Sequence, residues 1–189
     1  MRILLDTNVI INILTRRDDK YTNESLEIMR QCSNGSLVGY VAFHSLSTIS
    51  YVFRKLPFET RLAWMKLICE TLTIACSDNL LLLRAFQNED FIDIEDNLQD
   101  CCAQSVNADY IVTANVGDYY RSVVPALTPK NFMVALERHQ KACSAGVVES
   151  DNISSNESIS LKNADKPVLH RISIQVIHRH YHHILEFAS

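Results

Sequence analysis

Residues 2–11, Arg-Ile-Leu-Leu-Asp-Thr-Asn-Val-Ile-Ile, place the carboxylate of Asp6 inside a strongly hydrophobic segment. Burying an ionised carboxylate that has no partner is very unfavourable. Asp6 therefore needs a cation, a set of hydrogen bonds, or a position at the exposed end of a strand. Residues 2–5 are apolar and polar residues follow them, which predicts a short buried strand that ends just before Asp6.

Outward from this segment, strand and helix patterns alternate along the chain to about residue 142. Short apolar runs predict further strands at residues 37–43, 71–76, 108–113 and 126–127. Apolar spacing and capping residues predict helices at residues 8–15, 22–32, 45–55, 58–70, 78–88, 93–106 and 128–141. The alternation predicts one α/β domain, residues 1–142, with a mostly parallel sheet.

The sequence changes character after this domain. Residues 143–167 are rich in Ser and Asn and contain no aromatic residue, which predicts a flexible linker. Residues 168–189 form a C-terminal extension. Its residues 168–177 alternate apolar and polar positions, which predicts a strand that pairs with a sheet edge or with a second copy, giving a homodimer. The histidines of residues 178–183 are spaced to bind Zn²⁺ or Ni²⁺, although short exposed His tracts usually hold no physiological metal.

Composition excludes several classes of protein. The 189 residues are 47% hydrophobic and 21% charged, which is ordinary for a globular protein, and no apolar run is long enough to span a bilayer. Six scattered cysteines without a CxxC pair favour a reducing, cytoplasmic setting. A net charge of −4 argues against general coating of nucleic acid, yet it allows local phosphate contacts by Arg16, Arg17, Lys20, Arg54 and Lys55.

Acidic residues recur at positions that a parallel sheet brings to one edge. Asp6 follows the first strand, and Asn115 and Asp118 follow the strand at 108–113. Asp96 and Asp100 share a face of the helix between them. Because the carboxyl ends of parallel strands meet at one edge, these groups are expected to lie together. Clustered carboxylates need a cation, and oxygen ligands without His or Cys indicate Mg²⁺ or Mn²⁺.

Each acid also has a simpler interpretation. Asp6 could cap the following helix, Asp118 could be a turn residue, and Asp93 and Glu95 are best explained as complements to a helix dipole. A phosphatase of the haloacid-dehalogenase type would need a second Asp two residues after Asp6, where this chain has Asn8. The joint placement of the acids favours a metal site.

The chain resembles PIN-domain proteins, in particular the toxin ribonucleases of toxin–antitoxin pairs, over roughly residues 1–140. The resemblance lies in three stretches: LLDTNVII (4–11), DIEDNLQDCCAQSVNADYIVTANVGDY (93–119) and ALTPKNFM (126–133). It implies a Rossmann-like α/β/α fold and an endoribonuclease that hydrolyses RNA phosphodiester bonds with Mg²⁺ or Mn²⁺. It also implies RNA as substrate and an antitoxin protein as partner.

The resemblance further assigns the site residues. It implies that Asp6, Asp96 and Asp118 are catalytic and bind the metal. Asn8 and Asn115 match polar positions beside these acids, and Asp100 is a supporting residue one turn after Asp96.

One position departs from the family's pattern. In residues 46–51, Leu-Ser-Thr-Ile-Ser-Tyr, Thr48 stands where family members usually carry Glu. A hydroxyl can bind a metal-bound water but adds no negative charge, so cation binding and cleavage are expected to be weak, and a Glu at position 48 is expected to strengthen both. The alternative is a catalytically impaired PIN scaffold that binds RNA or protein.

Overall fold

In the part of the chain that the structure describes, five parallel strands form one sheet in the order β3-β2-β1-β4-β5, with the opening segment at its centre. The computed structural model describes residues 1–15, 20–87 and 93–146. The strands are β1 (Arg2–Leu5), β2 (Val38–Ala42), β3 (Thr73–Ala75), β4 (Tyr110–Val112) and β5 (Ala126–Leu127). The predicted α/β fold is confirmed, and the sheet is parallel throughout.

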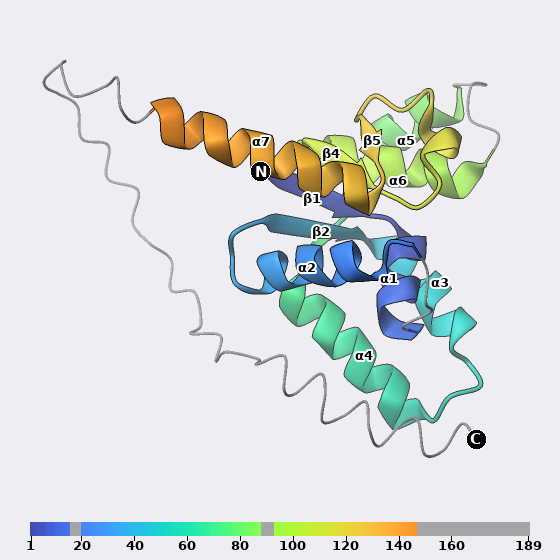
Figure 1. The fold of residues 1–189 in the computed structure, drawn as a ribbon. Coiled ribbons are helices and arrows are strands. Elements are labelled where there is room, and N and C mark those ends of the chain that lie inside the picture. Colours follow the sequence, from blue (N-terminus) through green and yellow to red (C-terminus); the bar gives the residue numbers. More distant parts are fainter. Residues whose placement is uncertain (16–19, 88–92, 147–189) are drawn as a thin grey trace, which may run out of the picture. The chain divides into compact units, whose positions relative to one another are not determined.

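Helices connect the strands and cover both faces of the sheet (Figure 1). They are α1 (Thr7–Thr15), α2 (Thr22–Ser33), α3 (Phe43–Val52), α4 (Phe58–Thr71), α5 (Asn79–Phe86), α6 (Ile94–Ser105) and α7 (Pro129–Gly146), with a short 3₁₀ helix η1 (Val116–Tyr119). No described helix combines the length and apolar character needed to cross a membrane.

The central strand is buried on both faces, as a parallel sheet requires. Ile3, Leu4 and Leu5 are completely buried, and burying each such side chain stabilises the fold by roughly 1.5–3 kcal/mol. Leu4 packs with Ile111 of β4 and with Ala103 of α6 in one cluster. Successive strand side chains point to opposite faces, so Ile3 and Leu5 fill the core on the other side of the sheet.

Most element boundaries agree with the predicted ones within a few residues, and the differences have local causes. Phe43 begins α3 rather than ending a strand, and α3 ends at Val52 instead of Lys55. The segment after β4, for which no helix was predicted, contains η1. Helix α7 continues to Gly146, so the first residues of the predicted linker are helical. The rest of that linker, the predicted strand of residues 168–177 and the histidines of 178–183 lie outside the described residues.

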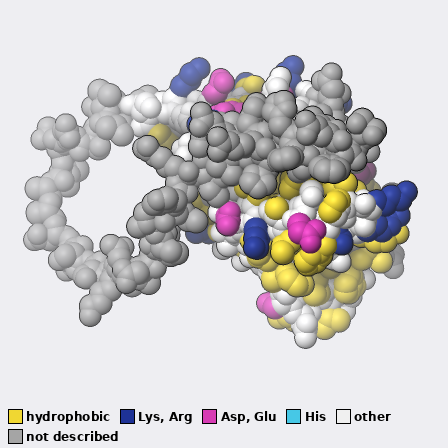
Figure 2. Space-filling view, turned by 90° about the horizontal axis from the view of Figure 1, so that it is seen from below, with side chains coloured by type: hydrophobic (Ala, Val, Ile, Leu, Met, Phe, Trp, Pro, Cys, Tyr) yellow, Lys and Arg dark blue, Asp and Glu magenta, His cyan; other side chains and the backbone are white. Residues whose placement is uncertain are grey.

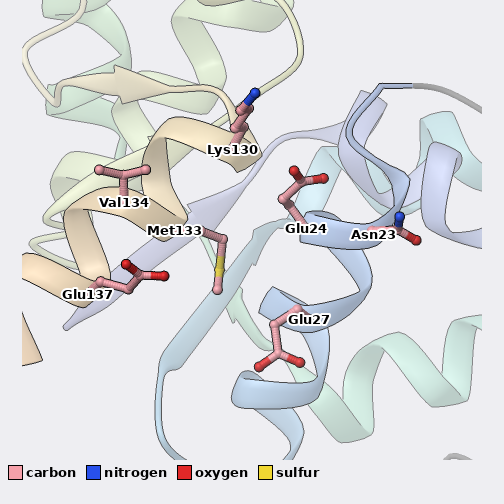
Figure 3. A pocket seen from close by; sticks show the side chains of 7 residues that line it. All are labelled: Asn23, Glu24, Glu27, Lys130, Met133, Val134 and Glu137. Carbon is pink, nitrogen blue, oxygen red and sulfur yellow. The ribbon is translucent and has the colours of Figure 1, made fainter.

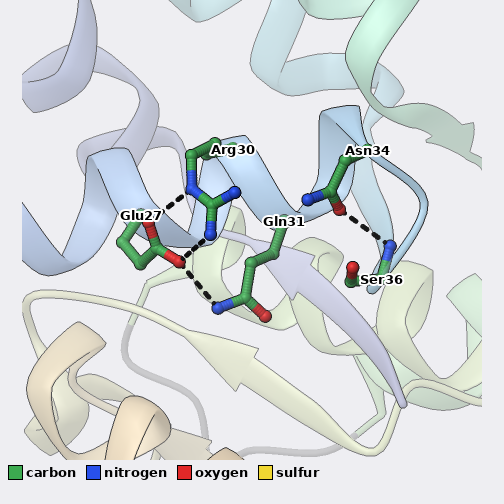
Figure 4. A network of polar contacts seen from close by, with 5 residues as sticks. All are labelled: Glu27, Arg30, Gln31, Asn34 and Ser36. Carbon is green, nitrogen blue, oxygen red and sulfur yellow. Dashed lines mark hydrogen bonds and ion pairs between the residues drawn. The ribbon is translucent and has the colours of Figure 1, made fainter.

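Polar contacts fix the turn between α2 and β2 (Figure 4). Glu27 accepts hydrogen bonds from Arg30 Nε at 2.6 Å and from Gln31 Nε2 at 2.9 Å, which lower the pKa of Glu27 to about 2. Asn34 Oδ1 then accepts a hydrogen bond from the backbone N–H of Ser36 at 3.0 Å. Gly35 between them has a φ of +79°, a left-handed conformation that glycine adopts without steric cost.

Candidate active site at the carboxyl edge of the sheet

The carboxyl ends of β1 and β4 lie side by side and place Asp6 next to Thr113. The backbone N–H of Asp6 donates to the carbonyl of Val112 at 3.0 Å, which continues the ladder beyond the last strand residue. Asp6 directly precedes α1, and its carbonyl accepts a hydrogen bond from the N–H of Val9 at 3.1 Å. The backbone of Asp6 therefore begins the helix, while its side chain is used elsewhere.

The Asp6 carboxylate is 5% exposed and is held by neutral hydrogen-bond donors. Asp6 Oδ2 accepts from Thr113 Oγ1 at 2.7 Å and from Asn8 Nδ2 at 2.7 Å, whereas Oδ1 has only Gln99 Nε2 at 3.4 Å. Burial raises the pKa of Asp6, and the Thr113 hydrogen bond opposes that rise in part. Of the three partners that a buried Asp6 could have, the structure shows a set of hydrogen bonds.

Asp96 lies in the first turn of α6 and is half-buried. Burial and then the negative charges of Asp6, Asp93 and Asp118 raise the pKa of Asp96 to about 6. No described residue donates a hydrogen bond of ordinary length to the Asp96 carboxylate. The same holds for the carboxylate of Asp118, which is exposed on η1. The fold therefore places Asp6 and Asp118 each within electrostatic range of Asp96.

Tyr119 is a site residue that the sequence analysis missed. It is 3% exposed, and its hydroxyl has no hydrogen-bond partner within normal distance among the described atoms. Burial and the charges of Asp6 and Asp96 raise the pKa of Tyr119, so its hydroxyl stays neutral beside both carboxylates. The signal available in the sequence was a large aromatic residue directly after Asp118.

Asp100 faces a loop. This buried carboxylate accepts hydrogen bonds from the hydroxyl of Ser122 and from the backbone N–H groups of Val123 and Val124, both at 3.2 Å. Gln104 Nε2 donates to it at 2.8 Å. Asp100 therefore fixes the segment that follows η1, and its supporting role in the site stays a prediction.

The two asparagines have different roles. Asn8 bridges the two strand ends, because its Nδ2 donates to Asp6 and its Oδ1 accepts from the backbone N–H of Ala114 at 3.1 Å. Asn115 is exposed, and its backbone N–H donates to Thr113 Oγ1 at 3.0 Å.

Thr48 contacts an acid that the sequence analysis assigned to the helix dipole. Thr48 Oγ1 donates to Glu95 Oε1 at 3.3 Å, and Thr7 Oγ1 lies 3.3 Å from the same oxygen. Asp93 does fit its predicted role, since it caps α6 by accepting from the backbone N–H of Glu95 at 2.7 Å. The side chain of Glu95 instead reaches α1 and α3.

Within the described ranges, no group of three or more His, Cys, Asp or Glu side chains is arranged closely enough to hold a metal ion. Of the predicted phosphate-contacting residues, Arg16 and Arg17 lie outside the described residues. Arg54 stacks on the Tyr51 ring at 4.2 Å, and Lys20 lies 4.7 Å from the Tyr21 ring.

A surface groove between α2 and α7 is separate from these residues (Figure 3). It is lined by Asn23, Glu24, Glu27, Lys130, Met133, Val134 and Glu137. None of the acids around Asp6 contributes to it, so the groove is not the candidate active site.

Comparison with known proteins identifies the fold. The family model of the PIN domain matches residues 2–117. The chain is similar to VapBC2 from Rickettsia felis bound to a DNA fragment from its promoter, at 18% identity and a TM-score of 0.52 over 68% of this chain and 98% of that one. It is similar to VapBC-1 from nontypeable Haemophilus influenzae, at 18% identity and a TM-score of 0.53 over 69% and 99%.

A third similar structure is FitAB bound to an IR36 DNA fragment, at 15% identity and a TM-score of 0.50 over 67% of this chain and 94% of that one. The sequence matches no curated protein. At these identities the structural likeness concerns the fold, whereas the family match extends over more than half of the chain and includes Asp6 and Asp96. The chain therefore belongs to the PIN-domain family.

Proposed function

We propose that this protein is an endoribonuclease of the PIN type that uses Mg²⁺ or Mn²⁺ and acts in the cytoplasm as the toxin of a toxin–antitoxin pair. The observation that carries the proposal is that Asp6 and Asp96, which both lie within the stretch matched by the PIN family model, are close enough to interact. Burial and the charges of Asp6, Asp93 and Asp118 raise the pKa of Asp96 to about 6, and a cation bound beside it would lower that pKa.

The donor atoms fit a hard divalent cation in their chemistry. Asp96 and Asp118 have carboxylate oxygens without hydrogen-bond partners among the described residues, and Asp6 Oδ1 has only the long contact to Gln99. The unpartnered hydroxyl of Tyr119 lies near Asp6 and Asp96. Oxygen ligands of this kind suit Mg²⁺ and Mn²⁺. The side chains would have to draw closer than they are here.

When bound, such a cation activates a water and stabilises charge on the phosphate under attack. Asp6, Asp96 and Asp118 would hold it. Thr113 and Asn8 orient the Asp6 carboxylate by donating to Oδ2. Oδ1 keeps only the long contact to Gln99. Asp100 keeps the loop after η1 in place, and the buried Tyr119 side chain lies near Asp6 and Asp96.

Two observations support an antitoxin partner. The VapBC and FitAB structures to which the fold is similar are toxin–antitoxin complexes, and this chain exposes large hydrophobic side chains on α3 and α4. These are Tyr51, Val52, Phe58 and Leu62. Figure 2, viewed from the side of α4, shows hydrophobic side chains gathered over part of the visible surface. Exposed apolar patches commonly mark protein contacts.

The cytoplasmic setting is supported by cysteine chemistry. None of the six cysteines forms a disulfide, and Cys32, Cys101 and Cys102 are buried. Cysteines without disulfide pairs are typical of a reducing compartment.

A second function, an RNA- or protein-binding PIN scaffold without catalysis, is favoured by Thr48 and by the open arrangement of the acids. RNA cleavage measured against Mn²⁺ concentration separates the two functions. We expect wild type to cleave, and we expect Asp6→Asn, Asp96→Asn and Asp118→Asn each to reduce the rate by roughly tenfold or more.

The matched control is Asp109→Asn, because Asp109 is an exposed acid at the opposite, amino end of β4. It should cleave like wild type. Absence of cleavage by wild type at every Mn²⁺ concentration would leave the scaffold as the function of this chain.

A further inference from the structure

Glu95 belongs to α6 but its carboxylate is held by two other helices. Thr7 at the start of α1 and Thr48 in α3 both place their hydroxyl oxygens 3.3 Å from Glu95 Oε1. A surface glutamate that only complemented the dipole of its own helix would have no reason to make these contacts. The separations in sequence are 88 and 47 residues, so the contacts are tertiary.

The Thr7 contact belongs to a group of hydrogen-bonded polar side chains. Gln99 Nε2 donates to Thr7 Oγ1 and to Ser45 Oγ, each at 2.9 Å, and makes a longer contact of 3.4 Å to Asp6 Oδ1. Thr7 Oγ1 lies 2.9 Å from Ser45 Oγ and 3.3 Å from Glu95 Oε1, and its one hydrogen can be donated to either. Gln99 therefore links Asp6 to the threonine that contacts Glu95.

This arrangement occupies one oxygen of Glu95 and leaves the other available. Both threonines contact Oε1, and no described residue donates to Oε2. A carboxylate that is held through one oxygen and has no partner at the other is suited to bind a cation.

Glu95 is also electrostatically part of the Asp6 site. Its charge contributes to the raised pKa of Asp6, and it opposes the lowering that burial causes in the pKa of His44. Two independent observations show unmet polar groups at the same place. Gln99 Oε1 is fully buried with no partner in the described structure, and the Tyr119 hydroxyl is in the same condition. Such groups call for a ligand or an ordered water.

We propose that Glu95 is the fourth carboxylate of the cation site and supplies the charge that Thr48 lacks, with Thr48 and Thr7 orienting it. The inference rests on the proposed function and deepens it. The carboxylate is supplied by α6 and contacts the hydroxyl of Thr48, whereas the family's Glu would come from position 48 of α3 itself.

The arrangement changes the expectation for Thr48→Glu. A carboxylate at position 48 would lie against that of Glu95 and repel it, so the single substitution should not improve the site. The double substitution Thr48→Glu/Glu95→Gln transfers the carboxylate from position 95 to position 48, two positions whose side chains are in contact. It keeps the net charge of the site.

The test is Mn²⁺ binding by the full chain without RNA, measured by calorimetry and by the rise of Tm with Mn²⁺. We expect Glu95→Gln to raise the Kd for Mn²⁺ by roughly tenfold or more. The double variant Thr48→Glu/Glu95→Gln should recover most of the affinity. Thr48→Val, which keeps the carboxylate and removes one orienting hydroxyl, should weaken binding less than Glu95→Gln does.

The matched control is Glu59→Gln, since Glu59 is an exposed acid in the first turn of α4. It should bind Mn²⁺ like wild type. Unchanged binding in Glu95→Gln, alongside a loss in Asp6→Asn, would overturn the role of Glu95 while the metal-dependent function stands. Absence of Mn²⁺ binding by wild type would overturn both. Tm in EDTA verifies that each variant is folded.

Discussion

Thr113 Oγ1 donates to Asp6 Oδ2 over 2.7 Å, and this buried contact joins the carboxyl ends of β4 and β1. The two residues are 107 positions apart in the chain. Thr113 also accepts from the backbone N–H of Asn115, so one hydroxyl links the site acid to the loop that carries Asp118.

Replacing this hydroxyl with a methyl group should therefore weaken both the fold and the site. We expect Thr113→Val to lower the free energy of unfolding by about 1–3 kcal/mol, since the lost hydrogen bond is made to a charged group. Urea denaturation at pH 7 measures the change. Thr73→Val, at an exposed position of β3, is the control and should change stability little. Equal effects of the two substitutions would contradict the importance of the Asp6 contact.

The raised pKa of Asp96 predicts an unusual pH dependence for the metal-free protein. This carboxyl ionises near 3.8 in the unfolded chain and near 6 in the folded one, so its contribution to stability is present at low pH and is lost as pH rises through about 6. The pKa of Asp6 is raised too, which acts in the same direction. We expect Tm in EDTA to fall between pH 4.5 and 7, and Asp96→Asn to flatten that fall.

Added Mg²⁺ or Mn²⁺ should reverse the trend, because a cation favours the ionised carboxylates. Glu27, whose pKa is lowered to about 2, affects stability below its ordinary value of 4.5 and so does not act in this range. The half-buried His44, whose pKa is lowered, acts in the opposite direction but equally in wild type and in Asp96→Asn. Parallel pH dependences of Tm in the two proteins would therefore contradict the electrostatic description of the site.

The buried hydrogen bonds of Asp100 predict a loss of stability when its carboxylate is replaced by an amide. In Asp100→Asn the amide NH₂ group would face backbone donors of Val123 or Val124, and a buried N–H would lose its acceptor. We expect a loss of about 2–3 kcal/mol in urea denaturation. Asp109→Asn removes an exposed acid that accepts one hydrogen bond from the Arg2 N–H, and it should cost less than about 1 kcal/mol. Similar losses for both variants would contradict the role of Asp100.

Two glycines predict opposite responses to an added methyl group. A Cβ on Gly39 of β2 would lie 2.6 Å from Cys32 Sγ and 2.6 Å from Leu72 Cδ2, so Gly39→Ala should destabilise the protein by about 1–3 kcal/mol. A Cβ on Gly117 would meet no atom within 4 Å, so Gly117→Ala should be neutral or stabilise by up to about 1 kcal/mol. Thermal unfolding compares them directly. A tolerated Gly39→Ala would show that α2 and the end of α4 can move away from the sheet.

The sequence by itself determined the order of strands and helices, the parallel α/β fold and the family. It could do so because these follow from local properties: the apolar run of residues 3–5, the spacing of buried positions on helices, and capping residues such as Asp78 and Asp93. Asp6, Asp96 and Asp118 were also predicted as one group, because strand ends in a parallel sheet share an edge.

Only the tertiary structure decided where the remaining side chains point. Glu95 is a first-turn acid in sequence, yet its side chain reaches Thr7 of α1 and Thr48 of α3. Asp100 shares a helix face with Asp96 but binds the loop after η1, and Tyr119 is buried between the acids rather than exposed in a loop. Local sequence fixes backbone conformation, whereas the partner of a polar side chain depends on which distant segment the packed core places within hydrogen-bond distance.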